Sequence, residues 1–169
     1  MSSVDFGDLA ERIGAALGSH GAVLVTAESC TGGWVAALVT SVAGSSAWFD
    51  RAFVTYSNQA KSEMLGVSPQ TLLQHGAVSE ATVREMALGA LARSPADIAV
   101  AISGIAGPGG GSPDKPVGTV CFAWATKESP SVYSVTERLR GDRTAVRAQA
   151  VRVALEGVIQ RLAGLSRRV

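Results

Sequence analysis

The sequence predicts an α/β fold: a three-layer α/β/α sandwich around a five-stranded mixed sheet. Segments typical of buried strands alternate with segments of helical periodicity along most of the chain. Near the C-terminus, two strand-like segments are separated only by a short turn, which requires an antiparallel pair in the sheet. The length of 169 residues fits one domain, and we find no linker and no internal repeat.

The first third of the chain predicts a helix followed by a β-α-β unit. Apolar residues over 9–17 recur at helical spacing among charged ones, which is typical of an amphipathic helix. Residues 22–27 are apolar on both faces and therefore predict a buried strand. A helix over 31–40 and a second strand over 51–56 complete the unit.

Three helices are expected between the second strand and the third. Asn58 is a suitable cap for a short helix over 58–65, and Ser68 followed by proline begins the next one. Ser79 and Glu80 open a longer helix that ends around Ala92.

The remainder of the chain predicts three strands, a long loop and a final helix. A strand over 97–103 runs into residues 104–113, which are too rich in Gly and Pro for either helix or strand. Strands over 118–126 and 132–139 form the hairpin that makes the sheet mixed. Asp142 then caps the last helix. Its apolar residues recur at spacings of four, three and four: Val151, Leu155, Val158 and Leu162.

Composition narrows the possible functions. The net charge of +1 argues against a domain whose affinity rests on the nucleic-acid backbone, so any anionic ligand should be small. Cys30 and Cys121 are too few for a disulfide framework and lack the neighbours that a zinc site needs, so we expect two reduced thiols and no metal. The N-terminal helix does not resemble a signal peptide, and no apolar run approaches a membrane span. We therefore expect a cytoplasmic protein, and the high apolar content of 47% favours a homodimer or higher homo-oligomer.

The first candidate site is the segment 28–33, directly after the first strand. Open α/β sheets bind ligands beyond the carboxyl ends of their strands. Ser29 is a candidate nucleophile there, and Gly32 and Gly33 let backbone N–H groups approach a ligand closely. The alternative is that Ser29 or Thr31 only caps the following helix. The segment matches neither the G-x-S-x-G nor the S-x-x-K motif, so a general base has to come from elsewhere in the chain.

Lys61 is the best candidate for that base. His20 precedes the first strand, at the wrong end of the sheet, and His75 stands at a predicted helix C-terminus. Tyr56 ends the second strand and leads directly into the helix that bears Lys61, so both can reach the rim where Ser29 lies. A lysine works as a base only if burial lowers its pKa; otherwise Lys61 is a solvated helix residue.

Two further features indicate an anionic or flat ligand. The loop 104–111 is neither a P-loop nor a dinucleotide fingerprint, but its glycines can form an anion-binding concavity or cover a flat ring. Arg143 and Arg147 lie in the first turns of the last helix, where the dipole disfavours cations. A ligand phosphate, or Asp142 and other acids, would offset that cost.

Taken together, seven ordered segments resemble the CinA C-terminal domain family over roughly residues 5–164. They are 27–33 (AESCTGG), 44–46 (GSS), 54–58 (VTYSN), the single residue Lys61, 75–79 (HGAVS), 103–108 (SGIAGP) and 115–120 (KPVGTV). The length resembles the stand-alone nicotinamide-nucleotide amidase form, without the molybdopterin-binding-like domain that CinA proteins carry in front.

The resemblance implies hydrolysis of the carboxamide of nicotinamide mononucleotide to nicotinic acid mononucleotide and ammonia, in pyridine-nucleotide recycling, without metal or cofactor. It implies Ser29 as the nucleophile, Lys61 as its base and Tyr56 as a third group that orients the lysine or moves the proton. Oxyanion and substrate contacts would come from this set: Thr31, Gly32, Gly33, Ser103, Gly104, Ala106, Gly107 and Arg143.

Two other functions stay open on sequence grounds. The chain could bind a pyridine nucleotide as a regulatory module without turning it over, although the presence of both Ser29 and Lys61 argues against this. The same α/β layout occurs in anticodon-binding domains, but that is an analogy of shape, and the near-neutral charge opposes it.

Overall fold

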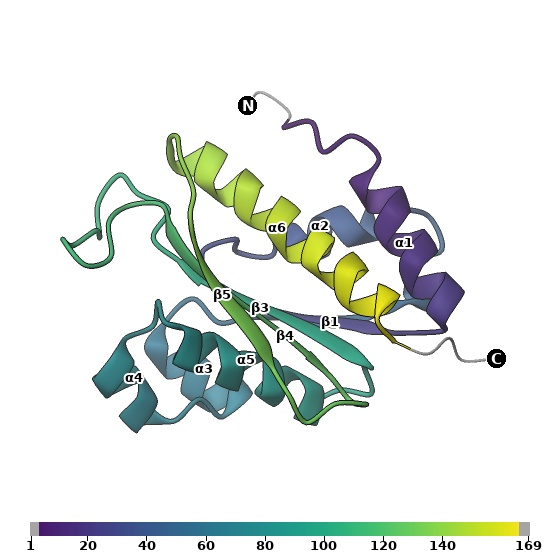
Figure 1. The fold of residues 1–169 in the computed structure, drawn as a ribbon, viewed down its shortest axis with the longest axis horizontal. Coiled ribbons are helices and arrows are strands. Elements are labelled where there is room, and N and C mark those ends of the chain that lie inside the picture. Colours follow the sequence, from purple (N-terminus) through teal and green to yellow (C-terminus); the bar gives the residue numbers. More distant parts are fainter. Residues whose placement is uncertain (1–3, 166–169) are drawn as a thin grey trace.

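A computed structural model describes residues 4–165, in which helices cover both faces of one five-stranded sheet (Figure 1). The helices are α1 (Leu9–His20), α2 (Trp34–Thr40), α3 (Asn58–Leu65), α4 (Pro69–His75), α5 (Glu80–Ala92) and α6 (Arg143–Ala163). The strands are β1 (Leu24–Glu28), β2 (Phe49–Val54), β3 (Ile98–Gly104), β4 (Thr119–Thr126) and β5 (Tyr133–Arg138). Helices α1, α2 and α6 lie on one face and α3, α4 and α5 on the other, which confirms the predicted three-layer α/β/α fold.

The sheet has the strand order β2-β1-β3-β4-β5. β1 pairs in parallel with both β2 and β3, whereas β4 is antiparallel to β3 and to β5, so the sheet is mixed as predicted. The carboxyl ends of β1, β2 and β3 therefore meet at one edge of the sheet. Glu28 at the end of β1 is in register with Val54 of β2 and Ile102 of β3. This edge is where an open α/β sheet binds its ligands.

Two apolar cores, one on each face of the sheet, hold the layers together. The first packs α1, α2 and α6 against one face through side chains such as Leu17 and Leu155, which are fully buried. The second packs α3 and α5 against the other face through Leu65 and Met86. Because β1 and β3 are covered on both sides, their residues are buried in succession instead of in alternation.

Local backbone chemistry shifts several predicted boundaries. The helix expected over 31–40 begins only at Trp34, because Gly32 and Gly33 adopt positive φ angles of 60° and 95° that a right-handed helix does not allow. The second strand starts and ends two residues earlier than predicted, at Phe49 and Val54. The prediction that Asn58 caps α3 was wrong: Ser57 is the cap, since its hydroxyl accepts from the Ala60 N–H at 3.0 Å. A short 3-10 helix, Ser45–Ala47, was not predicted.

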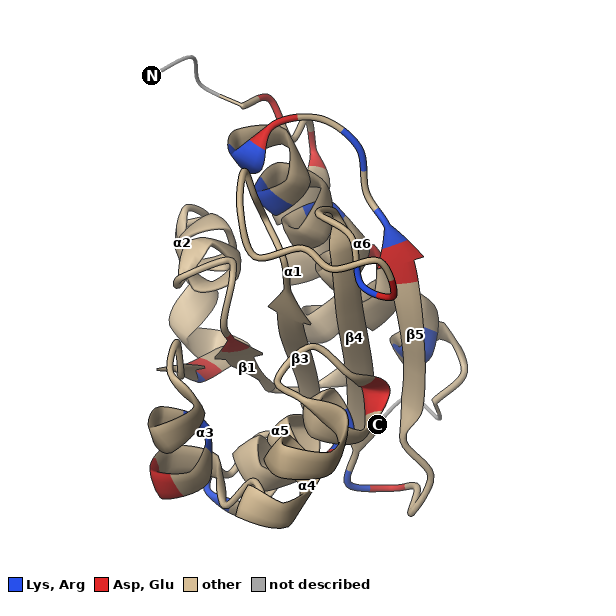
Figure 2. Cartoon of the chain, turned by 90° about the vertical axis from the view of Figure 1, so that its left-hand side faces the viewer, with Lys and Arg blue, Asp and Glu red and all other residues tan. Residues whose placement is uncertain are grey.

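Charged residues are dispersed over the molecule. In Figure 2 charged residues of both signs lie mainly near the ends of the elements, including the carboxyl end of the edge strand β5, while the central strands carry almost none. Among residues 4–165, no helix is long and apolar enough to cross a membrane. The same residues contain no group of three or more His, Cys, Asp or Glu side chains able to hold a metal ion.

Candidate active site

A cavity of about 210 Å³ opens at the carboxyl ends of β1, β2 and β3. Its lining residues come from the end of β3, from the segments that follow β1, β2 and β3, from α3, from the segment between α4 and α5, and from the start of α6. They are Ser29, Cys30, Tyr56, Lys61, Ala77, Val78, Ser103, Gly104, Ala106 and Arg143. None of these residues is acidic. The cavity therefore combines hydroxyl, thiol, amine and guanidinium groups without a carboxylate.

Ser29 and Lys61 meet in this cavity, although 32 positions separate them in the chain. The Lys61 amine lies 3.0 Å from Ser29 Oγ and donates to the Thr55 carbonyl oxygen at 2.8 Å. Ser29 directly follows β1, and its N–H donates to the Ile102 carbonyl of β3. Lys61 lies in the first turn of α3. The two groups thus have the separation that proton transfer from a serine to a general base requires.

Lys61 is only 1% exposed, so it is not the solvated helix lysine of the alternative interpretation. Burial lowers the pKa of the Lys61 amine from its ordinary value of 10.5, because a buried ammonium loses its hydration. A thiolate at Cys30 would oppose this shift. Burial raises the pKa of Cys30 to about 11, however, so its thiol is neutral near pH 7 and provides no counter-charge. The environment therefore favours a neutral amine, which is the form that accepts a proton.

Glu28 anchors the loop that carries Ser29. Its carboxylate is completely buried at the end of β1 and accepts from the hydroxyls of Thr26 and Thr31. It also accepts from the N–H groups of Val35 and Ala36 in the first turn of α2, at 2.9 and 3.1 Å. The Glu28 carboxylate therefore serves the N-terminus of α2, together with the Thr31 carbonyl, which accepts from the Trp34 N–H at 3.1 Å; the hydroxyls of Ser29 and Thr31 do not cap the helix. The Ser29 hydroxyl is left free for the cavity.

The backbone of the 29–33 loop has both engaged and free N–H groups. The Gly32 N–H donates to the Ser29 carbonyl at 3.0 Å, so it is not available as an oxyanion donor in this conformation. The N–H groups of Cys30, Thr31 and Gly33 have no acceptor among residues 4–165. Of these residues, only Cys30 lines the cavity.

Arg143 closes one side of the cavity. Its guanidinium donates to the Gly107 carbonyl at 2.8 Å and to the Tyr56 hydroxyl at 3.0 Å, which links α6 to the glycine-rich loop and to the segment after β2. The Tyr56 side chain is 62% exposed, and its hydroxyl is bonded to Arg143 and not to Lys61. The carbonyl of Thr55, not Tyr56, is thus the group that orients Lys61 in this structure.

The structure brings together some, but not all, of the residues predicted for substrate contact. Ser103, Gly104, Ala106 and Arg143 line the cavity, whereas Thr31, Gly32, Gly33 and Gly107 lie beside it. Ser103 is 1% exposed, and its hydroxyl has no hydrogen-bond partner within the described part of the chain. A Cβ atom at Gly104 would lie 2.7 Å from the Val120 side chain, so only glycine fits this strand end.

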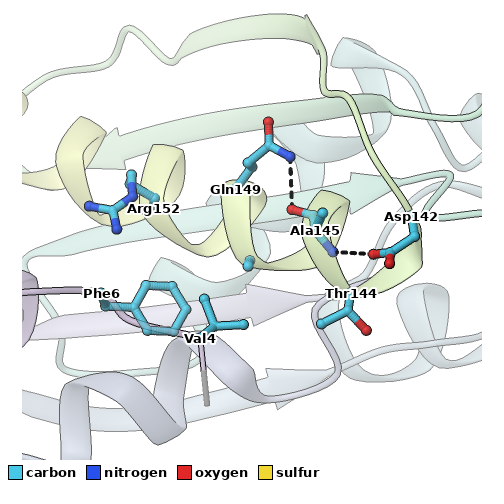
Figure 3. A pocket seen from close by; sticks show the side chains of 8 residues that line it. Val4, Phe6, Asp142, Thr144, Ala145, Gln149 and Arg152 are labelled. Carbon is cyan, nitrogen blue, oxygen red and sulfur yellow. Dashed lines mark hydrogen bonds between the residues drawn. The ribbon is translucent and has the colours of Figure 1, made fainter. Parts of the chain in front are cut away.

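Neither histidine reaches the cavity. The His20 ring lies 2.9 Å from the Ala16 carbonyl in the last turn of α1, and His75 ends α4. A larger hollow of about 500 Å³ lies over α6 (Figure 3), but three of its polar side chains, Asp142, Gln149 and Arg152, bond to backbone groups of the chain. Asp142 caps the helix at Ala145, and Gln149 donates to the Ala145 carbonyl. We therefore place the candidate active site at the Ser29–Lys61 cavity.

Sequence reasoning missed two residues that shape the site. Glu28 was visible only as a charge at the end of an apolar strand, and that contrast was the available signal for a buried anchor. Arg147 was expected near a phosphate or an acid, but its guanidinium binds the carbonyls of Cys30 and Thr31, at 3.0 and 3.1 Å. No sequence pattern indicates such a contact, because its partners are backbone atoms more than a hundred positions away.

Comparison with known proteins supplies independent information. Residues 7–162 match the model of the CinA C-terminal domain. The chain is 57% identical over 160 residues to the nicotinamide-nucleotide amidohydrolase PncC of Escherichia coli (strain K12), covering 95% of this chain and 96% of that protein. It is 51% identical to the PncC of Pseudomonas putida, covering 90% and 94%. The crystal structure of the competence/damage inducible protein CihA from Agrobacterium tumefaciens superposes with a TM-score of 0.88 at 48% identity, covering 95% and 99%.

Proposed function

The chain belongs to the CinA C-terminal domain family, and from this premise we propose that it is a nicotinamide-nucleotide amidohydrolase. It hydrolyses the carboxamide of nicotinamide mononucleotide to nicotinic acid mononucleotide and ammonia, as a step of pyridine-nucleotide recycling. Relatives with this name at 57% and 51% identity over nearly their whole length support the assignment. The contact of 3.0 Å between Ser29 Oγ and a buried, uncompensated Lys61 amine is the observation that carries the chemistry.

Ser29 is the proposed nucleophile and Lys61 its general base. A neutral Lys61 amine keeps one N–H on the Thr55 carbonyl and turns its lone pair to the Ser29 hydroxyl. As Ser29 Oγ bonds to the amide carbon, its proton passes to Lys61 Nζ. The resulting ammonium then returns this proton to the leaving nitrogen, the C–N bond breaks, and ammonia departs. Water hydrolyses the Ser29 ester by the same path in reverse and releases the acid.

The negative charge that develops on the amide oxygen needs backbone donors. Cys30 follows the nucleophile directly and lines the cavity, and its N–H donates to no backbone carbonyl among residues 4–165, so we assign this N–H the first position. The unengaged N–H groups of Thr31 and Gly33 are the next candidates, and Gly32 would contribute only if its bond to Ser29 opened. One such donor typically lowers a barrier by about 2.7–4 kcal/mol.

The cavity of about 210 Å³ suits the flat pyridinium carboxamide, while the ribose and phosphate extend past its mouth. The unpaired Ser103 hydroxyl, with Gly104 and Ala106, would hold the ring. Arg143 uses two of its five N–H donors, so it can bind a phosphate with the others, and Gly107 positions it. Tyr56, bonded to Arg143, keeps its own O–H, and we assign it the relay that gives this proton to the leaving nitrogen and takes the Lys61 proton in its place.

Ammonia release from nicotinamide mononucleotide tests the proposal. The purified protein should turn over, whereas Ser29→Ala and Lys61→Ala should each lose roughly 10³-fold or more in kcat. The double variant should lose about as much as either single one, because the two residues act as a unit. Lys127→Ala is the matched control, since the Lys127 amine also donates to a backbone carbonyl, that of Pro95, but on the exposed surface.

Two results would contradict the proposal. Wild-type turnover in Ser29→Ala would remove the nucleophile. Tight binding of the mononucleotide by the wild-type protein without ammonia release would instead identify a regulatory binding module.

We also propose that residues 1–169 act as one domain, in the cytoplasm, and assemble as a homodimer or higher homo-oligomer. Exposed apolar side chains on α3 and α4 support the assembly, with Leu73 81% and Met64 41% exposed. Light scattering of the purified protein measures the mass, and a monomer at micromolar concentration would contradict it.

A further inference from the structure

Arg147 binds the loop that carries the proposed nucleophile, although Arg147 itself does not line the cavity. Its Nε donates to the Cys30 carbonyl at 3.0 Å, and its Nη2 donates to the Thr31 carbonyl at 3.1 Å. Its guanidinium carbon lies 5.3 Å from the centre of the Trp34 ring. One half-buried side chain on α6 thus binds two successive peptide groups and stacks on the first residue of α2.

The geometry of the peptide bond transmits the effect of these two hydrogen bonds to Ser29. In a trans peptide the C=O and the next N–H point in opposite directions. Holding the Thr31 carbonyl therefore turns the Gly32 N–H away from Arg147, and that N–H donates to the Ser29 carbonyl at 3.0 Å. Holding the Cys30 carbonyl likewise turns the Thr31 N–H away, and this group has no acceptor among residues 4–165.

The loop is held from a second direction by Glu28. The Thr31 hydroxyl donates to Glu28 at 2.8 Å, while the Thr31 carbonyl accepts from Arg147. Thr31 is therefore fixed at both its side chain and its backbone. The Ser29 N–H is fixed on β3, so the only part of Ser29 that stays free to react is its hydroxyl.

We infer that Arg147 is a positioning residue: by holding the carbonyl oxygens of Cys30 and Thr31, it keeps the Ser29 hydroxyl within reach of Lys61. This inference rests on the proposed function, because it assigns a role in the same reaction. A displacement of about 1 Å at a reacting group can reduce turnover by roughly 10²-fold. Arg147 acts only through the loop, so its loss should reduce kcat and leave substrate affinity nearly unchanged.

The test compares Arg147→Met with Arg152→Met, a matched control from the same helix. Arg152 is also half-buried, donates to one backbone carbonyl, that of Asp5, and lies 5.9 Å from the centre of the Phe6 ring (Figure 3). We expect Arg147→Met to lose roughly 10²-fold in kcat with KM within about threefold, and Arg152→Met to keep wild-type kcat. The pH of half-maximal kcat/KM should not move, because Lys61 and its partners stay in place. Arg147→Lys should recover only part of the loss, since one amine does not reproduce the fork that spans two carbonyls.

Several outcomes would overturn the inference. These are a kcat of Arg147→Met within threefold of wild type, an equal loss in Arg152→Met, a rise in KM alone, or a shifted pH profile. If Arg147→Met does not fold, Arg147→Lys decides the question by the same criteria. Full activity in Arg147→Lys would show that the guanidinium bonds to both carbonyls are not needed.

Amide hydrogen exchange separates this inference from the proposed function, because it needs no turnover. In Arg147→Met, or in Arg147→Lys if Met does not fold, the Gly32 amide should exchange at least about tenfold faster than in wild type, since its hydrogen bond to Ser29 loses its support. An unchanged exchange rate of the Gly32 amide would refute the positioning role of Arg147, even if the enzyme is active. If the Gly32 amide exchanges faster in the variant but the wild-type protein releases no ammonia, the positioning of the loop by Arg147 stands and the proposed reaction is wrong.

Discussion

Replacing Lys61 with Met should change how the stability of the protein depends on pH. In the unfolded chain the amine has its ordinary pKa of 10.5, and in the folded chain burial lowers that pKa. Between the lowered pKa and 10.5 the unfolded state therefore binds more protons than the folded state, and folding becomes more favourable as pH rises. Below the lowered pKa, the folded state has to hold a buried ammonium whose partners are the Ser29 hydroxyl and the Thr55 carbonyl.

The magnitude follows from linkage. Within that window, one proton contributes a slope of about 1.4 kcal/mol per pH unit to the free energy of unfolding. Lys61 is 1% exposed, so solvent screening removes little of this effect. Lys61→Met keeps the length and the apolar stem of the side chain but does not titrate. The unfolding free energy of wild type minus that of Lys61→Met should therefore rise with pH up to 10.5 and be flat below the lowered pKa.

Urea denaturation of both proteins at a series of pH values from 7 to 10.5 measures this difference and cancels the contributions of other groups. Lys127→Met, which removes an exposed amine, is the control for the loss of a lysine charge. If Lys61 is the base, the acid limb of kcat/KM should have its midpoint at the pH where the slope begins, because kcat/KM reports the free enzyme. A difference that is flat over the whole range would refute the lowered pKa, and with it the neutral amine.

Three further predictions concern packing, an unpaired hydroxyl and the cavity thiol. Gly157→Ala should destabilise the protein by about 1–3 kcal/mol, because a Cβ atom there would lie 2.2 Å from the Trp124 ring. Gly18→Ala, where a Cβ meets no atom within 4 Å, should stabilise it by about 0.5–1 kcal/mol. Thr55→Val should raise the unfolding free energy by about 1 kcal/mol, since the Thr55 hydroxyl is buried without a partner in the described chain, and Lys61 uses the Thr55 carbonyl. Cys30→Ala should keep kcat within about threefold of wild type. Iodoacetamide should modify Cys30 at pH 8 roughly 100-fold more slowly in the folded protein than in urea, because folding raises the pKa of Cys30 from 9.0 to about 11.

Each of these predictions has a contradicting result. If Gly157→Ala and Gly18→Ala shift the melting temperature in the same direction, helix propensity and not contact with Trp124 decides the effect. A lower melting temperature for Thr55→Val would mean that the hydroxyl has a partner. Rapid alkylation of Cys30 would contradict its raised pKa, and loss of ammonia release in Cys30→Ala would give its thiol a role in the reaction.

The arrangement of layers was predictable because it follows from periodicity. Strands β1 and β3 carry apolar residues at successive positions, Leu24–Val25 and Ile98–Ile102, which indicates burial on both faces, and the short connection between β4 and β5 fixes an antiparallel pair. The boundary at α2 was not predictable in the same way. Gly32 and Gly33 delay the helix by their left-handed backbone, and the pattern of apolar residues does not register backbone handedness.

The meeting of Ser29 and Lys61 was predictable for a topological reason. Both follow the carboxyl ends of neighbouring parallel strands, and such ends lie at one edge of the sheet. The hydrogen bonds that fix these residues were not predictable, because most of the partners are backbone groups. The carbonyl of Thr55, which orients Lys61, and the carbonyls of Cys30 and Thr31, which bind Arg147, carry no residue-specific signal.

Glu28 and Lys61 are both buried and ionisable, but they have different roles because of what surrounds them. Glu28 has four donors on its two oxygens, from Thr26, Thr31, Val35 and Ala36, so its charge is fully compensated. None of these donors is Lys61, and a salt bridge between the two would keep the lysine charged and useless as a base. Because the start of α2 and two threonines satisfy Glu28, the fold can bury a carboxylate beside the site and still leave the amine without a counter-ion. A substitution that removed donors from Glu28, such as Thr31→Val, should therefore weaken the loop without supplying Lys61 with a partner.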